Sequence, residues 1–89
     1  MKVTLNCENL VKREQAHAYL QEALNLPEYY GRNLDALYDC LTEMSGCTIA
    51  LRGASWLRRA DGYGVWILRT LEDAARENPG LEIVEEEEA

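Results

Sequence analysis

Apolar residues recur along this chain with two periods, and each period predicts one kind of secondary structure. Val3 and Leu5 alternate with polar neighbours, which predicts a short strand over residues 1–6. The compact run Cys47–Leu51 is largely apolar and predicts a buried central strand. Apolar residues spaced three and four apart predict helices. We expect helices at about residues 13–24, 33–44 and 65–77, one short helical turn at 55–59, and a last strand at 81–84.

The order of these elements predicts an α/β fold. Helices separate successive strands, so the chain has to cross over between them, and crossover connections join parallel strands. We therefore expect a small three-stranded parallel sheet covered by helices, and the pattern leaves the strand order open. Residues 1–84 are expected to form a single domain. Residues 85–89 are expected to form an acidic tail, because a terminal run of glutamates is typical of a solvated chain end.

Two glycine-containing segments are expected to lie at the two ends of one helix. Gly62–Gly64 predicts a flexible approach to the long helix at 65–77, and Asn78–Gly80 predicts the end of that helix. Between the first two long helices, Pro27 blocks helix continuation and Gly31 permits an unusual turn.

The loop around Pro27 carries Tyr29 and Tyr30, and it leads into a helix for which Asn33 is a natural N-cap. The sequence leaves two alternative roles open for the two tyrosine rings. They close the core while their hydroxyls stay hydrated, or they present an aromatic surface to a partner.

The helix after Asn33 has an apolar face and an acidic face. The apolar face consists of Leu34, Leu37, Leu41 and Met44. Asp35, Asp39 and Thr42 point the other way, with Tyr38 on their flank. Carboxylates on an outer helix face are usually only solvated. Two at this spacing repel each other by about 0.2–0.5 kcal/mol, so together with the adjacent tyrosines they favour a binding face for a cationic protein.

The stretch from Leu26 to Thr42 reads LPEYYGRNLDALYDCLT, and it closely resembles the barstar family of small intracellular inhibitors of secreted microbial ribonucleases. Length and element order are also similar along the rest of the chain, while residue identity outside the motif is weak. The resemblance implies a barstar-like fold whose loop and helix plug a ribonuclease active site, with acidic side chains in place of the substrate phosphates. It carries this role over to Tyr29, Asn33, Asp35, Tyr38, Asp39 and Thr42.

The chain departs from the best-known member of that family at the rim of the implied site. Tyr38 stands where that protein has a tryptophan, and Glu43 and Met44 replace a glycine and a tryptophan. Asp73 stands where the fourth helix of the family offers a glutamate to the enzyme. The resemblance implies that Asp39 pairs with the arginine and histidine side chains that normally hold phosphate. These departures leave the identity of the cognate enzyme open.

Composition agrees with a binding protein. The 89 residues carry a net charge of −7, which disfavours nucleic acid and favours a basic partner. Removing the four glutamates at 85–88 leaves −3, so the pair Asp35 and Asp39 matters more than the total. Three cysteines and one histidine have no metal-ligand spacing, so we expect no metal and no cofactor. The chain has neither a membrane-length apolar run nor a signal-peptide pattern, so we expect a cytoplasmic protein.

The leading interpretation is an inhibitor or immunity protein that binds one basic ribonuclease per chain and is a monomer when free. A second is a barstar-like module that neutralises a different toxin or partner. A third is a small hydrolase that uses Asp35 and Asp39 as acid and base, although no activated nucleophile or glycine-rich phosphate loop accompanies them. A lone histidine without a nearby cysteine, serine or acidic dyad is more often structural than catalytic, so we expect a structural role for His17. Trp66 is left open between a core residue and a partner contact.

Overall fold

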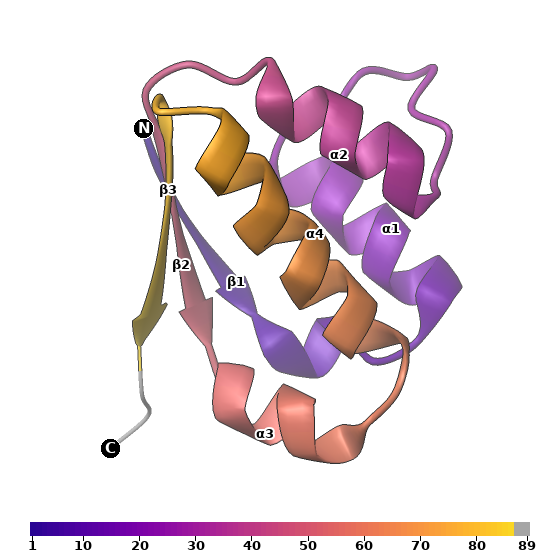
Figure 1. Cartoon of the computed structure of the whole chain (residues 1–89). Helices are drawn as coiled ribbons and strands as arrows, with labels where there is room; N and C mark the ends of the chain where they lie inside the picture. Colours follow the sequence, from indigo (N-terminus) through magenta and orange to yellow (C-terminus); the bar gives the residue numbers. More distant parts are fainter. Residues whose placement is uncertain (87–89) are drawn as a thin grey trace.

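The computed structural model describes residues 1–86 and shows a parallel sheet with helices packed along it (Figure 1). The predicted α/β class and the predicted order of elements are confirmed, and a 3-10 helix after the first strand was not predicted. In chain order the elements are β1 (Lys2–Asn6), the 3-10 helix η1 (Cys7–Leu10), α1 (Arg13–Ala23), α2 (Leu34–Thr42), β2 (Cys47–Arg52), α3 (Ala54–Ala60), α4 (Tyr63–Glu77) and β3 (Leu81–Glu86).

The three described strands form one parallel sheet in the order β1-β2-β3, so β2 is central as predicted. Leu5 pairs with Leu51, and Ile49 pairs with Ile83. Both crossovers step in the same direction across the sheet. Because such crossovers are nearly always right-handed, both place their helices on the same side of the sheet, as Figure 1 shows.

The core fills the space between the sheet and these helices. It is built from the inward residues of the strands and the apolar stripes of α1, α2 and α4. The fully buried members include Leu5, Ile49 and Leu51 from the sheet and Leu20, Leu37, Leu41, Ile67 and Leu71 from the helices. The helices α2 and α4 pack against each other. Beyond the end of α4, the amide Nδ2 of Asn78 donates to the carbonyl oxygens of Leu41 at 3.0 Å and Met44 at 2.6 Å, which ties down the end of α2.

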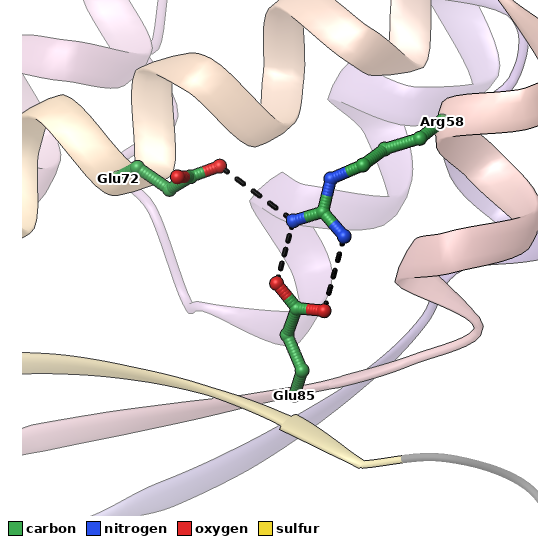
Figure 2. A network of polar contacts seen from close by, with 3 residues as sticks. All are labelled: Arg58, Glu72 and Glu85. Carbon is green, nitrogen blue, oxygen red and sulfur yellow. Dashed lines mark hydrogen bonds and ion pairs between the residues drawn. The ribbon is translucent and has the colours of Figure 1, made fainter.

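The last strand is longer than the sequence predicted. Glu85 and Glu86 belong to β3, so the prediction that an acidic tail begins at residue 85 is wrong for these two residues. The guanidinium of Arg58 donates to the two carboxylate oxygens of Glu85 at 3.0 and 2.5 Å, and it lies 3.8 Å from Glu72 (Figure 2). These hydrogen bonds lower the pKa of the Glu85 carboxyl. The network joins α3, α4 and β3, and residues 87–89 lie outside the described part of the chain.

The predicted flexible approach at Gly62–Gly64 is also wrong, because α4 begins at Tyr63 and includes Gly64. Gly64 is buried at the contact of α4 with α3 and η1. A Cβ at this position would lie 2.4 Å from Cδ1 of Leu57 and 2.9 Å from the carbonyl oxygen of Leu10. Glycine is therefore required here by close packing and not by a flexible turn.

We predict that Gly64→Ala lowers the free energy of unfolding by about 1–3 kcal/mol, because the added methyl group overfills the contact with Leu57 and Leu10. The matched control is Gly62→Ala, since nothing lies within 4 Å of a Cβ at Gly62. That variant should cost less, up to about 1 kcal/mol, because Gly62 is the N-cap of α4 and alanine is a poorer cap than glycine. Urea denaturation followed by far-ultraviolet circular dichroism measures both. Equal effects of the two substitutions would contradict the close-packing account.

Candidate functional site

The helix α2 separates its apolar and acidic residues as the sequence predicted. Leu37 and Leu41 are fully buried, whereas Asp35 and Asp39 are exposed on the outer face. Tyr38 and Thr42 are half-buried on the flank of this face. Among residues 1–86, neither aspartate belongs to a salt bridge with another side chain. The structure therefore presents two unpaired carboxylates, one helical turn apart, to solvent.

Asn33 fixes where this helix begins. Its side-chain oxygen Oδ1 accepts a hydrogen bond from the backbone N–H of Ala36 at 2.7 Å, and its Nδ2 donates to the carbonyl oxygen of Gly31 at 3.3 Å. This is the N-cap that the sequence predicted. Asp35 lies in the first turn, where the helix dipole favours a negative charge. The amide of Asn33 is thus used within the chain, and its first role is to orient α2.

The loop before α2 is fastened to α1 by Gln21. The Oε1 atom of Gln21 accepts two hydrogen bonds from Arg32, one from Nε at 3.1 Å and one from Nη2 at 2.9 Å. The Nε2 atom of Gln21 donates to the carbonyl oxygen of Pro27 at 3.0 Å. The backbone of Arg32 has a positive φ of 51°, a conformation that non-glycine residues adopt infrequently. Sequence reasoning missed Gln21, because nothing in the local pattern around residue 21 shows that it meets residues 27 and 32.

The two tyrosines of the loop have opposite environments. Tyr29 is 88% exposed, so its ring is available to a partner, whereas Tyr30 is only 6% exposed. The hydroxyl of Tyr30 lies 2.6 Å from Nδ1 of His17, and Nε2 of the same imidazole lies 2.6 Å from the hydroxyl of Tyr63. His17 itself is fully buried. Of the two roles open for the tyrosines, Tyr30 has the core role and Tyr29 has the exposed one.

The contacts of His17 join the loop, α1 and the first turn of α4. A neutral imidazole donates from one nitrogen and accepts at the other, so one tyrosine hydroxyl donates to His17 and the other accepts from it. Burial, followed by the nearby positive charges of Arg13 and Arg32, lowers the pKa of His17. Burial raises the pKa of both Tyr30 and Tyr63. All three groups are therefore neutral near pH 7.

A hollow of about 440 Å³ lies between the loop and the flank of α2. Tyr29 and Gly31 line it from the loop, and Asp39, Cys40 and Met44 line it from the region of α2. Its walls are largely apolar, while Asp39 and Glu43 each supply a carboxylate. Such a hollow has room for one side chain from a partner, with a carboxylate available to a positive charge.

Asp73 lies on α4, the helix packed against α2, and it is exposed. Its carboxylate is held by the guanidinium of Arg76, three residues further along the same helix. Asp73 therefore differs from Asp35 and Asp39 in having a cation of its own. The structure brings Tyr29, Asn33, Asp35, Tyr38, Asp39 and Thr42 together on the loop and α2, and it places Asp73 on the neighbouring helix.

Two of the three cysteines have thiols whose pKa is raised by burial. Cys7, Cys40 and Cys47 are all unpaired. Burial raises the pKa of Cys7 to about 11 and also raises the pKa of Cys40, so both remain protonated thiols near pH 7. Within residues 1–86 no three His, Cys, Asp or Glu side chains are grouped so as to hold a metal ion. In the same part of the chain, no helix is both long and apolar enough to span a bilayer.

Comparison with known proteins identifies the family of this chain. The family model described as Barstar (barnase inhibitor) matches residues 1–87, so the chain belongs to the Barstar family. A protein of Bacillus subtilis (strain 168) named "Putative ribonuclease inhibitor YrdF" is 46% identical to this chain over 41 residues. The aligned stretch covers 46% of this chain and 45% of that relative.

We predict that stability falls as the pH is lowered from about 6.5 to about 5, because the unfolded chain binds a proton at residue 17 that the folded chain excludes. The lowered pKa of His17 sets the sign. The contribution of neutral His17 to folding stability is complete above the pKa that this histidine has in the unfolded chain. It is lost as the pH falls toward the lower pKa of His17 in the folded chain. The slope attributable to this group is at most about 1.4 kcal/mol per pH unit.

Urea denaturation of the wild-type chain and of His17→Gln at several pH values measures this slope. The variant should be less stable at neutral pH and should lack the wild-type slope in this window. The pH range from about 6.5 to about 5 lies above 4.5, the ordinary pKa of Glu85. This limits the contribution of the Glu85 carboxylate to the measured slope. Identical slopes for the two proteins would contradict the assignment to His17.

Proposed function

We propose that this protein inhibits a basic microbial ribonuclease by binding one-to-one over its active site. The observation that carries the proposal is the pair of exposed, unpaired carboxylates of Asp35 and Asp39 beside the exposed ring of Tyr29. Membership of the Barstar family supports it. A ribonuclease active site holds cations for the phosphates of RNA, and these cations are the natural partners of two carboxylates on an open helix face.

The electrostatic part of this mechanism uses charges that the free protein leaves without cations. Asp39 lines the hollow next to Tyr29 and is placed to meet an arginine or histidine side chain that enters it. Asp35 sits one turn earlier and meets a cation at the edge. Charge-assisted hydrogen bonds of this kind are about twice as strong as neutral ones. An acidic face also speeds encounter with a basic enzyme at low salt.

The steric part depends on the rigidity of the loop. Gln21 and His17 fix the loop to α1, and Asn33 fixes the start of α2. A face that is already ordered loses less conformational entropy when it binds. Tyr29 then packs on an enzyme side chain, and the hydroxyl of Thr42, which donates to the carbonyl oxygen of Asp39 at 3.0 Å, still has lone pairs to accept a hydrogen bond.

We predict stoichiometric inhibition without turnover. Titrating the protein into a panel of basic microbial ribonucleases, with RNA cleavage as the readout, should abolish the activity of at least one enzyme at a molar ratio of one. The complex should run as a one-to-one species in sedimentation. If no ribonuclease loses activity at micromolar excess, the alternative of a barstar-like module with another toxin or partner takes its place.

We predict that Asp39→Ala weakens binding by about 2–5 kcal/mol, because the substitution leaves an enzyme cation buried and unpaired. This range is general for truncated charge pairs, and its reference cases include the barnase–barstar complex. Asp35→Ala should cost less, since Asp35 lies at the edge. The charge-matched control is Glu8→Ala, which removes an exposed carboxylate from η1. Competition titration measures all three, and equal losses would show that net charge rather than this face drives association.

A further inference from the structure

The two tryptophans of the chain are both unusually exposed, Trp66 by 54% and Trp56 by 46%. Their positions differ. Trp56 is on α3, which lies at the opposite end of the molecule from α2, whereas Trp66 is on α4, which packs against α2 (Figure 1). Leaving a large aromatic side chain half in solvent forgoes much of the stabilisation that its burial would give. The exposed indole of Trp66 therefore calls for an explanation near α2.

The position of Trp66 on α4 can be fixed from the ends of the helix. Tyr63, Trp66, Thr70 and Asp73 follow one another at spacings of three and four residues, so they share one side of α4. Tyr63 lines a hollow together with Asn33, Leu34 and Asp35, at the start of α2. At the other end, the side chain of Asn78 bonds the last carbonyls of α2. The side of α4 that carries Trp66 therefore runs beside α2, next to the acidic face.

One face of the Trp66 indole contacts a cation of the same helix. The guanidinium carbon of Arg69 lies 5.2 Å from the ring centroid, over one face of the indole. A cation in this position is attracted to the ring and restricts its motion. The rest of the exposed indole is open to solvent. Trp66 is thus an exposed aromatic surface on the helix that packs against α2, and tryptophan is among the residues that carry most binding energy in interfaces.

We propose that Trp66 is a further contact for the same ribonuclease, on the helix α4 that also carries Asp73. This inference rests on the proposed function. The chemistry of the occupant follows from Asp35, because Tyr63, on the same side of α4 as Trp66, lines a hollow with this carboxylate, which has no salt bridge among residues 1–86. The group that fits is an arginine or lysine of the basic enzyme. Its aliphatic stem packs on the exposed indole and its charged end reaches a carboxylate.

The test compares Trp66→Ala with Trp56→Ala against the ribonuclease that the wild-type chain inhibits. Both substitutions remove a half-exposed indole, so Trp56→Ala is a matched control away from α2. Trp66→Ala should weaken binding by about tenfold or more, and Trp56→Ala by less than about twofold. Thermal unfolding of each free variant shows whether it is folded. Equal affinities for Trp66→Ala and the wild-type chain would overturn the inference.

A second readout does not depend on truncating the side chain. The wild-type chain is labelled with 5-fluorotryptophan, and its two fluorine resonances are assigned with Trp66→Phe and Trp56→Phe. Adding the ribonuclease should shift the resonance of Trp66 and leave that of Trp56 in place. A Trp66 resonance that moves with the concentration of the free chain would assign the surface to a second copy of this protein and would overturn the inference.

The outcomes separate this inference from the proposed function. If the wild-type chain inhibits no ribonuclease, both fail. If inhibition depends on Asp39 while Trp66→Ala binds as tightly as the wild-type chain and the Trp66 resonance of the wild-type chain is unmoved, the proposed function stands and Trp66 lies outside the binding face.

Discussion

The buried imidazole of His17 connects three segments that are far apart in the sequence. Its two hydrogen bonds, each 2.6 Å, reach Tyr30 in the loop before α2 and Tyr63 in the first turn of α4. Moving the loop away would leave Nδ1 of His17 without its partner, and a buried polar group without a partner costs about 1–3 kcal/mol. The loop, α2 and α4 therefore have a fixed relation to one another, and the exposed ring of Tyr29 has a fixed place beside Asp39.

This rigid frame allows the outer face of α2 to be unfavourable for the free protein. Asp35 and Asp39 repel each other and have no cation among residues 1–86, while Trp66 keeps about half of its surface in solvent. Each feature is a modest loss that the buried stripe of α2, with Leu37 and Leu41 at 0% exposure, easily exceeds. In a complex with a basic enzyme the same features become attractive. On the proposed function, the face is thus arranged for a partner rather than for the stability of the free chain.

How far the sequence predicts this structure depends on whether the signal is local. The cap at Asn33 and the apolar stripe that follows it are local, so α2 and its acidic face were predicted nearly residue by residue. The inclusion of Gly64 in α4 depends on its packing against Leu57 and Leu10, which no local pattern contains. The place of Glu85 in β3 depends on pairing with β2 and on Arg58, so the sequence predicted a tail instead. The hydrogen bonds of Gln21 were missed for the same reason.

On the proposed function, the loop and α2 form the surface that covers the ribonuclease. Cross-saturation by nuclear magnetic resonance, from the unlabelled enzyme to the isotope-labelled chain, tests it most directly, because it reports which amides lie at the interface. The account predicts strong effects at residues 29–42 and along the adjoining side of α4, with none on α3 or on the strands. Effects concentrated on α3 or the open face of the sheet, with residues 29–42 unaffected, would contradict it.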